Sequence, residues 1–368
     1  MKIMFVITGL GMGGAEKVVT SLADAFAEKG HHVLIAYLTG DALVLPANPA
    51  IRIVDLHFKQ PTNIIAAYFR FRRLVIDFKP DIVHSHMVHA NILARLLRIS
   101  TSLPRLISTA HSSNEGGRLR MLAYRLTDRL ADISTNVSDE AVAAFIERKA
   151  ANYGRMVTVH NGISTINFSF SFYARATIRQ QLGIKDNCKL ILAVGRLNDA
   201  KDYPNLFRAL QRVNTSSIDF KVFIVGDGPL RGKLQAMMRE LHLNDCVELL
   251  GTRHDVAKLM CAADVFVLSS AWEGFPLVVG EAMACECVVV ATDCGGVSEF
   301  IGSTGYLVPC RRPAALAEAL AAALALSPSA SKTLGQAARQ RVQDRYSLDA
   351  AVEKWLQLYN GIDIKGAV

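Results

Sequence analysis

The feature that most restricts the fold of this chain is an alternation of short β-rich runs with helical patterns, which occurs twice along the sequence. In the first half, the runs that have the length and composition of strands are 2–8, 31–38, 51–56, 81–86, 104–111, 131–137 and 156–160. Apolar residues from Ala15 to Phe26 recur at helical spacing, and a second helical stretch covers 62–79. This alternation predicts parallel strands joined by crossover helices.

The pattern stops in the middle of the chain and then starts again. Residues 161–176 have no helical period and are rich in Ser and Asn, so we place a domain boundary there. The strand-like runs that follow are 189–195, 220–226, 246–252, 263–270 and 287–292. The sequence therefore predicts an α/β chain with an N-terminal domain of residues 1–165, a C-terminal domain of residues 166–344 and a final amphipathic segment from 345 to the C-terminus.

Length and composition agree with two soluble domains. A chain of 368 residues is long enough for two domains, and a hydrophobic content of 51% excludes a disordered chain. No apolar run approaches the roughly 18 residues that a membrane helix needs, and no secretory signal is recognised. The seven cysteines form no CxxC pair, which favours a reducing cytoplasm and disfavours a zinc site. Residues 1–165 hold 19 Lys and Arg against 13 Asp and Glu, so their net charge of +6 indicates an anionic partner or solubility alone.

A glycine-rich loop follows the first predicted strand and opens the first predicted helix. Gly9, Gly11 and Gly14 let a ligand approach the backbone, and a helix N-terminus is a favourable place for phosphate. The same spacing fits the GxGxxG dinucleotide motif. A nicotinamide site also needs an acid at the end of the second strand, and residues 37–40 contain none, although Asp41 follows in the loop. A tight turn without a ligand would produce the same glycine pattern.

Three predicted loops of the second half carry residues suited to a nucleotide sugar. Arg196 and Lys201 follow the strand at 189–195 and could bind a diphosphate, or form an ordinary solvated loop. The turn around Gly228 suits a tight connection with a possible nucleotide contact. The strongest signal is the segment 269–285, in which Glu273 and Glu281 are eight residues apart among apolar residues. A carboxylate there is a good acceptor for two neighbouring sugar hydroxyls.

The start of the helix after Glu273 suits phosphate as well. Pro276 fits a first helical position, which leaves the backbone N–H groups of Leu277 and Val278 free to meet an anion. In the first half, His111 closes the strand-like run 104–111 and could touch the sugar, although a lone histidine is as often structural.

These motifs together resemble the retaining glycosyltransferases of the GT4 type, which have the GT-B fold. The resemblance covers nearly the whole chain, through GMGGAE at 11–16, His111, NGI at 161–163, VGRL and Lys201 at 194–201, GDGPLR at 226–231 and EGFPLVVGEA at 273–282. It implies two Rossmann-like domains whose parallel sheets face a central cleft, with the final helix returning to the first domain. One departure is local, because Asp202 and Tyr203 follow Lys201 where many members have Gly.

The resemblance also implies roles for individual residues. Glu281 would hold the donor ribose, Arg196 and Lys201 would bind the diphosphate, and the glycine loop with Gly14 would approach it. Contacts to the donor sugar would come from Glu273, Gly274, Phe275, Pro276, Leu277 and Val278, with His111 beside the sugar. The expected catalytic residues are therefore Glu273, His111, Arg196 and Lys201. No Asp-x-Asp occurs, so we expect no metal and no cofactor other than the nucleotide-sugar co-substrate.

We expect a hexosyl or N-acetylhexosaminyl transferase that uses a UDP-sugar and a lipid-linked saccharide of surface polysaccharide synthesis, peripheral at the inner face of the membrane. The acceptor expectation rests on two basic and apolar stretches, whose arginines are Arg118, Arg125, Arg129, Arg70, Arg72 and Arg73. At 100° per residue, the first three fall on one arc beside Leu119, Leu122 and Leu126. An ordinary helix that packs these leucines on the sheet would have the same pattern. The sequence also leaves open a soluble acceptor, a nucleotide-sugar epimerase, a nicotinamide oxidoreductase and a non-catalytic binding protein.

Overall fold

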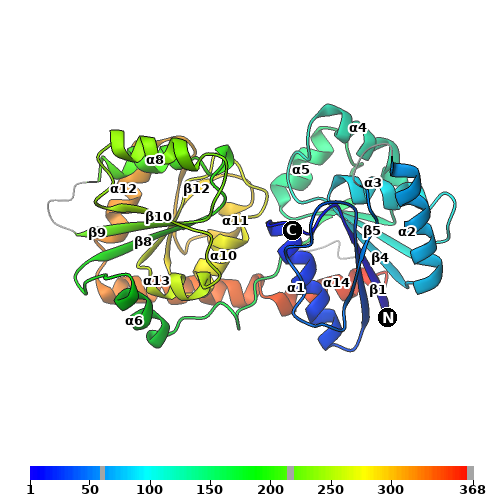
Figure 1. Cartoon of the computed structure of the whole chain (residues 1–368), viewed down its shortest axis with the longest axis horizontal. Helices are drawn as coiled ribbons and strands as arrows, with labels where there is room; N and C mark the ends of the chain where they lie inside the picture. The colour runs from blue at the N-terminus through cyan, green and yellow to red at the C-terminus, as the bar shows by residue number, and fades with distance from the viewer. Residues whose placement is uncertain (59–62, 214–218, 363–368) are drawn as a thin grey trace. The chain divides into compact units, whose positions relative to one another are not determined.

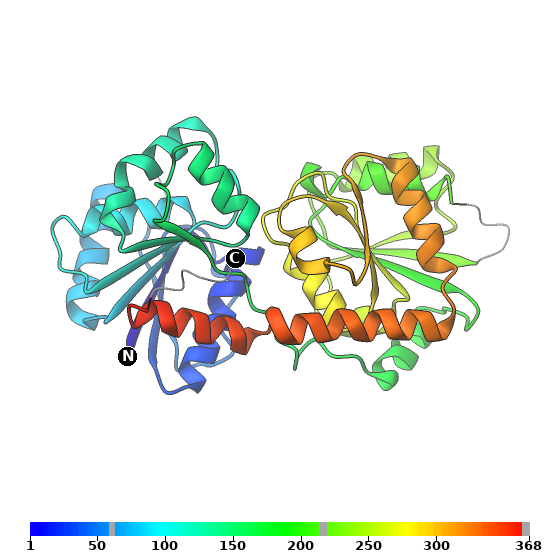
Figure 2. The ribbon, with the colours of Figure 1, turned by 180° about the vertical axis from the view of Figure 1, so that it is seen from behind.

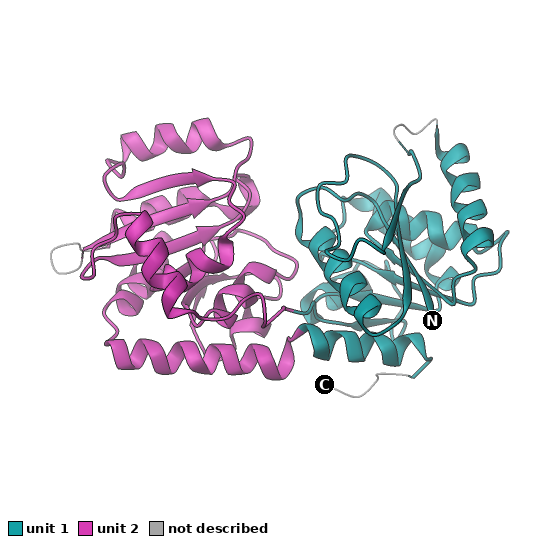
Figure 3. Ribbon diagram, turned by 60° about the horizontal axis from the view of Figure 1, so that its bottom comes forward, with its two compact units in different colours: residues 1–162, 348–368 teal, residues 163–347 magenta. Residues whose placement is uncertain are grey.

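The computed structural model describes residues 1–58, 63–213 and 219–362, which form two compact α/β units (Figure 3). Unit 1 contains residues 1–162 and 348–368, and unit 2 contains residues 163–347. The boundaries expected from the sequence, after 165 and after 344, each differ from these by three residues. Residue 62 of the predicted helix 62–79 and residues 363–368 of the predicted final segment lie outside the described residues.

Unit 1 is built on a parallel sheet in the strand order β3-β2-β1-β4-β5-β6-β7. The strands are β1 (Lys2–Ile7), β2 (His32–Tyr37), β3 (Arg52–Asp55), β4 (Ile82–His86), β5 (Arg105–Thr109), β6 (Ile133–Asn136) and β7 (Met156–Thr158). The helices are α1 (Gly14–Glu28), α2 (Ile64–Phe78), α3 (Val88–Leu97), α4 (Arg118–Thr127), the short 3-10 helix η2 (Asp128–Leu130), α5 (Asp139–Glu147) and α14 (Leu348–Tyr359).

Helices cover both faces of this sheet, which explains why its strands are apolar on both sides. Helices α2 and α3 lie on one side of the sheet and α1 lies on the other (Figure 1). Met4 and Val6 of β1 pack with α2 and α3, whereas Phe5, between them in sequence, packs against Phe26 of α1 with a ring separation of 6.1 Å. Successive side chains of a strand point to opposite faces, so a continuous apolar run such as 3–7 requires two covering layers.

Helix α14 joins unit 1 although it is more than 300 residues from α1 in the chain. The two helices lie side by side (Figure 2), and Lys29 forms a 2.9 Å ion pair with Glu353. Tyr359 of α14 packs on Phe26 and hydrogen-bonds to His84 of β4 at 2.7 Å. The predicted final segment therefore contains a helix that completes the covering layer of unit 1.

Unit 2 has a second parallel sheet, in the order β10-β9-β8-β11-β12-β13. Its strands are β8 (Lys189–Val194), β9 (Phe220–Val225), β10 (Val247–Gly251), β11 (Val265–Leu268), β12 (Val288–Asp293) and β13 (Tyr306–Pro309). Its helices are α6 (Phe172–Gln181), the 3-10 helix η3 (Asp199–Lys201), α7 (Tyr203–Leu210), α8 (Arg231–Glu240), α9 (Val256–Ala262), α10 (Leu277–Ala284), α11 (Val297–Ile301), α12 (Pro313–Leu324) and α13 (Pro328–Arg345). Helices α7, α8 and α12 share one core with the sheet.

Three elements of unit 2 are absent from the sequence expectation. β13 has four residues and is stabilised by pairing with β12, a long-range contact that a local pattern does not reveal. α6 begins inside the stretch 161–176, where the Ser171 hydroxyl accepts a hydrogen bond from the Ala174 backbone N–H and caps the helix. α13 is largely polar, and it packs against α10.

The order of each sheet reverses direction at one point, between β1 and β4 in unit 1 and between β8 and β11 in unit 2. Open parallel sheets bind their ligands outside the carboxyl ends of the strands at this switch point. The loop with Gly9 to Gly14 follows β1, the loop with Arg196 and Lys201 follows β8, and the loop with Glu273 follows β11. Three of the segments singled out in the sequence therefore lie at the switch points, where a ligand is expected to bind.

Candidate active site

The centre of the candidate site in unit 2 is an ion pair between two residues that are 72 positions apart. Lys201 Nζ lies 2.5 Å from Glu273 Oε1, and the two side chains are only 17% and 14% exposed. The Ser270 hydroxyl donates a second hydrogen bond to the same carboxylate oxygen at 2.6 Å. The structure therefore brings a cation and a carboxylate together at the switch point of this sheet. A bound anion such as a diphosphate could replace the Glu273 carboxylate as the partner of Lys201.

Backbone contacts hold the loops after β8 and β11 in register. The Ser269 hydroxyl donates to the Lys201 carbonyl at 2.8 Å, and the Ala271 N–H donates to the Ala200 carbonyl at 2.8 Å. Tyr203, whose pKa is raised by burial, donates its hydroxyl to the Gly195 carbonyl at 3.1 Å. These bonds fix the position of Lys201 relative to Glu273 without using either charged group.

Gly228, which the sequence suggested as a donor contact, has a packing reason of its own. A Cβ at Gly228 would lie 2.5 Å from the Leu197 carbonyl oxygen, and at Gly226, where φ is +136°, a Cβ would overlap the Gly195 carbonyl. The Leu197 N–H donates to the Asp227 carbonyl at 3.0 Å. Glycine is needed because two strand-end loops meet backbone to backbone. Contact between Gly228 and a nucleotide stays a prediction.

Helix α10 begins one residue later than the sequence suggested. Pro276 is the N-cap rather than the first helical residue, and Leu277 and Val278 form the first turn. Phe275 anchors this start by stacking on Phe300 at 4.0 Å, and the Gly274 carbonyl accepts a hydrogen bond from the Gly296 N–H at 2.9 Å. The first turn is half-buried and lies shortly after Glu273, where an anion could meet its N–H groups.

The other two charged candidates of unit 2 differ in their surroundings. Glu281 lies on α10 and is 6% exposed, so a carboxylate is held within an apolar helix. Arg196 is exposed, and its guanidinium has no carboxylate partner among the residues that the structure describes. A buried acid and an exposed cation at the same edge of one sheet are suited to polar sugar hydroxyls and to phosphate, respectively.

In unit 1, the glycine loop ends at the start of α1 with Gly13 as N-cap and Gly14 as the first helical residue. Glu16 in the first turn folds back over Gly13, so that a Cβ at Gly13 would overlap the Glu16 carboxylate. Burial raises the pKa of Glu16. The loop therefore presents a helix N-terminus next to a partly buried acid, a feature that the glycine pattern alone did not reveal.

His111 lies two residues beyond the end of β5 and takes part in a chain of partly buried polar groups. Its ring nitrogen Nε2 is 3.1 Å from Nδ1 of His86, and its backbone N–H donates to Glu115 Oε1 at 2.6 Å. Glu115 also accepts a 2.6 Å hydrogen bond from the Tyr124 hydroxyl of α4. Burial raises the pKa of Glu115, whereas these hydrogen bonds lower it. The sequence reasoning missed Glu115 and Tyr124, although they follow His111 closely in the chain, because no periodic pattern or motif shows that the Glu115 carboxylate turns back to the His111 backbone.

The neutral state of His111 has a measurable consequence. Burial lowers its pKa to about 4, and burial also lowers the pKa values of His84 and His86. The unfolded chain then binds protons below pH about 6.5 that the folded chain does not bind. We expect unit 1 to lose stability as the pH falls from about 6.5 toward 4. His111→Asn should remove about 1 kcal/mol of this loss between pH 6.5 and 5.5.

Urea unfolding at the two pH values checks this expectation. Trp355 lies in unit 1 and Trp272 in unit 2, so a Trp272→Phe background lets the remaining fluorescence report unit 1 alone. The exposed His32, changed to Asn, is the matched control. An unchanged pH dependence in His111→Asn would show that this histidine is not held neutral.

Helix α4 does not pack its leucines on the sheet. Leu119 is 83% exposed, Leu126 is 74% exposed and Leu122 is 47% exposed, while Met121 and Tyr124 face the core. Arg118 and Arg125 are exposed on the same helix. The expectation that an ordinary helix packs these leucines on the sheet is therefore wrong, because α4 packs through Met121 and Tyr124 and presents leucines and arginines to solvent.

Arg129 departs from the helical arc that the sequence predicted for Arg118, Arg125 and Arg129. α4 ends at Thr127 and continues as the 3-10 helix η2, which contains Arg129. Because η2 has about three residues per turn, the 100° rule does not extend to this arginine. In the second basic stretch, Arg70 and Arg73 are exposed on α2, Arg72 is half-buried, and Arg73 lies 3.8 Å from Asp77.

Among the described helices, no single one is long and apolar enough to cross a membrane. Only the pair α12 and α13 meets that requirement jointly, and it is bent by 112° at the break.

Two family models match the chain, one over each unit. The model described as glycosyl transferases group 1 matches residues 174–341, and the model described as glycosyltransferase family 4 matches residues 12–166. Together they leave only the two ends and a short segment around 167–173 unmatched.

Curated relatives and solved structures agree with these matches. The chain is 28% identical to N-acetylgalactosamine-N,N'-diacetylbacillosaminyl-diphospho-undecaprenol 4-alpha-N-acetylgalactosaminyltransferase of Campylobacter jejuni, over 83% of this chain and 84% of that protein. It is 24% identical to N-acetyl-alpha-D-glucosaminyl L-malate synthase of Bacillus anthracis, over 95% and 94%. The crystal structure of Anabaena Alr3699/HepE in complex with UDP has a TM-score of 0.85 at 21% identity, over 98% of this chain and 100% of that chain. The chain belongs to the group 1 glycosyltransferases, and its two Rossmann-like units have the architecture of the GT-B fold.

Proposed function

We propose that this glycosyltransferase moves a hexose or N-acetylhexosamine, with retention of configuration, from a UDP-sugar to a lipid-linked saccharide during synthesis of a surface polysaccharide such as O-antigen or capsule. The observation that carries the lipid-linked acceptor is α4, which exposes Leu119, Leu122 and Leu126 beside arginines. Exposing three leucines on one short helix is unfavourable in water and becomes favourable at a membrane surface. The enzyme would then act as a peripheral protein at the inner face of the membrane.

The donor side of the proposal rests on unit 2. Lys201 and Arg196 are the cations for the diphosphate, the first turn of α10 supplies backbone N–H groups, and Glu281 is the acceptor for ribose hydroxyls. Glu273 lies just after the end of β11. When the diphosphate replaces it as the ion-pair partner of Lys201, the Glu273 carboxylate would be free to contact the donor sugar. UDP is the proposed nucleotide because a structural neighbour is described in complex with UDP.

The proposed chemistry needs little from the protein beyond charge and position. The bond between the sugar and the diphosphate breaks, and the acceptor hydroxyl attacks the same face of the sugar and gives its proton to the departing diphosphate. Lys201 and Arg196 would stabilise the negative charge of that diphosphate. His111 would stand beside the sugar as a neutral group that can hydrogen-bond, since burial lowers its pKa to about 4. We assign no protein nucleophile and no metal to this step.

The name of one relative supports a lipid-linked acceptor, and the name of another supports a soluble one. The Campylobacter jejuni relative carries diphospho-undecaprenol, a lipid diphosphate, in its name. The Bacillus anthracis relative is named for L-malate, a small soluble molecule, so a soluble acceptor is the second candidate. The exposed leucines favour the first candidate because a soluble acceptor gives them no role.

A leucine variant of α4 tests the lipid-linked acceptor. We expect the combined change Leu119→Ser, Leu122→Ser and Leu126→Ser to reduce sedimentation with anionic vesicles by about tenfold or more, since each leucine loses its apolar contact with lipid. Transfer to a lipid-linked saccharide in vesicles should slow in parallel, and UDP binding should be unchanged. Phe172→Ser with Tyr173→Ser, two exposed aromatic residues of unit 2, is the matched control.

Two results would contradict this proposal. The wild-type protein could ignore anionic vesicles at low salt, or it could glycosylate a soluble small molecule better than any lipid-linked one. Either result would favour the soluble acceptor and leave the donor chemistry of unit 2 unaffected.

A further inference from the structure

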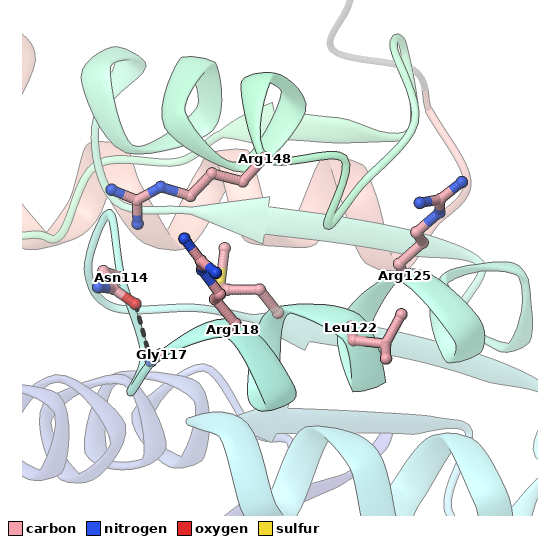
Figure 4. A pocket seen from close by; sticks show the side chains of 7 residues that line it. Asn114, Gly117, Arg118, Leu122, Arg125 and Arg148 are labelled. Carbon is pink, nitrogen blue, oxygen red and sulfur yellow. Dashed lines mark hydrogen bonds between the residues drawn. The ribbon is translucent and has the colours of Figure 1, made fainter.

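A hollow of about 390 Å³ lies on unit 1 between α4 and the end of α5, outside the residues assigned to the donor. Figure 4 shows that the guanidinium groups of Arg118 and Arg148 both extend into the space above the first turn of α4, whereas Arg125 stands farther along the helix and points away from them. The remaining lining comes from Asn114, Gly117, Met121 and Leu122. Arg148 is the C-cap of α5, and no sequence motif marks it.

Three of the seven described residues that line this hollow are arginines, and none of the seven is an acid. Within the same described part of the chain, neither Arg118 nor Arg125 has a carboxylate partner, and Arg148 uses one guanidinium nitrogen to donate to the Ser113 carbonyl at 2.8 Å. Two guanidinium groups that share one hollow repel each other, and an anion between them would relieve this repulsion. Their remaining N–H groups suit phosphate or carboxylate oxygens, which guanidinium binds through paired hydrogen bonds.

The loop that forms one wall of the hollow is held in a defined shape. Asn114 Oδ1 accepts hydrogen bonds from the Gly117 N–H at 3.1 Å and from the Gly116 N–H at 3.3 Å. Gly116 and Gly117 have φ values of +111° and +92°, which favour glycine at both positions. Because this loop begins at His111, a ligand in the hollow would sit against the same segment that carries His111.

We infer that Arg118 and Arg148 form a subsite for an anionic group of the acceptor, either a phosphate or a carboxylate. Met121 and Leu122 contact the carbon skeleton next to that group, and Arg125 adds positive charge at the rim. Calling the ligand an acceptor rests on the proposed function, whereas binding of the anion itself does not. Not every arginine of this region belongs to the subsite: Arg118, Arg125 and Arg148 line the hollow, whereas Arg129 lies in η2 and does not.

Side-chain NMR of arginine Nε–Hε groups tests the subsite without any enzymatic activity. The probes are inorganic pyrophosphate, which represents a lipid diphosphate, and glucuronate, which represents an acidic sugar, each titrated in buffer with about 150 mM salt. We expect the signals of Arg118 and Arg148 to move with at least one probe. Observing individual arginines keeps this site distinct from anion binding by Arg196 in unit 2.

Arginine variants test whether Arg118 and Arg148 bind the same anion. Arg118→Gln should raise the half-saturation concentration at Arg148 about tenfold, equivalent to about 1.4 kcal/mol, because one charge-assisted contact is lost. Arg129→Gln, an exposed arginine outside the hollow, should change it less than about twofold. Arg148→Gln should weaken binding at Arg118 in the same way. Arg148→Lys, which keeps the positive charge near Ser113 but loses the paired hydrogen bonds of a guanidinium, replaces it if Arg148→Gln does not fold.

Kinetics identify the source of the anion. Arg118→Gln should raise the acceptor KM about tenfold with little change in kcat. The acceptor to use carries a diphosphate if pyrophosphate moved the NMR signals, and carries glucuronate if glucuronate moved them. The inference is overturned if neither probe moves the Arg118 and Arg148 signals, or if Arg129→Gln weakens binding as much as Arg118→Gln does. Signals that move while no lipid-linked acceptor is used would support the subsite and contradict only the proposed acceptor.

Discussion

Replacing Lys201 by Met is expected to lower kcat by about 100-fold or more while the nucleotide still binds. In the free enzyme, Lys201 is paired with Glu273 at 2.5 Å. We propose that the lysine meets the charge that develops on the departing diphosphate, so its loss acts on the transition state more than on binding. Steady-state kinetics with a UDP-sugar at saturating acceptor measure the effect.

Controls separate this role from a structural one. In Lys201→Met, the half-buried Glu273 carboxylate keeps only its hydrogen bond from the Ser270 hydroxyl, which could destabilise the fold. The stability of the variant must therefore be measured by thermal unfolding alongside the kinetics. Arg196→Gln removes the second cation without stranding a carboxylate and should also reduce kcat strongly. Arg239→Gln, at the far end of α8, should leave kcat unchanged.

The same proposal predicts that the wild-type enzyme stays active in EDTA, because Lys201 and Arg196 would then supply the positive charge that a metal supplies elsewhere. The assignment fails if EDTA abolishes activity and Mg²⁺ or Mn²⁺ restores it, or if Lys201→Met retains wild-type kcat.

Replacing Glu281 by Ala is expected to weaken UDP binding by about 1–3 kcal/mol, the range of hydrogen bonds to a charged group. Glu281 is buried on α10, eight residues after Glu273. A buried carboxylate that accepts from two ribose hydroxyls loses both bonds in the variant. Isothermal titration calorimetry with UDP measures the change directly.

Two variants make the Glu281 experiment specific. Glu318→Ala removes an exposed acid of α12 in the same unit and should leave UDP affinity unchanged. Glu273→Ala should affect turnover and sugar preference more than the binding of UDP. Equal UDP affinity in Glu281→Ala and wild type would remove Glu281 from the nucleotide site.

The sequence predicted the fold class because the fold class depends on local periodicity. Strands such as β1 and β8 are short apolar runs bounded by turn residues, and the parallel arrangement follows from the helical patterns between them. The same local logic placed Gly14, Lys201 and Glu273 in segments that follow strands. It failed for β13 and for the last turn of α4, because strand pairing and the change to a 3-10 helix at Asp128 depend on neighbours distant in sequence.

Contacts within the candidate site required the tertiary structure. Nothing local links Lys201 to Glu273 or Arg118 to Arg148, since the first pair is joined by adjacent strands β8 and β11 and the second by helices that meet only in the folded unit. The contact between Glu115 and the His111 backbone is different, because the two residues are only four positions apart and the bond is made within one loop.

The sequence by itself thus determined that Gly14, Lys201 and Glu273 lie in segments after strand ends, whereas their binding of a nucleotide sugar stays a prediction. The tertiary structure alone decided which of them pair, that the leucines of α4 face solvent, and that Arg148 joins Arg118. The physical reason is the range of the interactions: periodicity and turn chemistry act within a few residues, whereas burial and ion pairing depend on segments that only folding brings together.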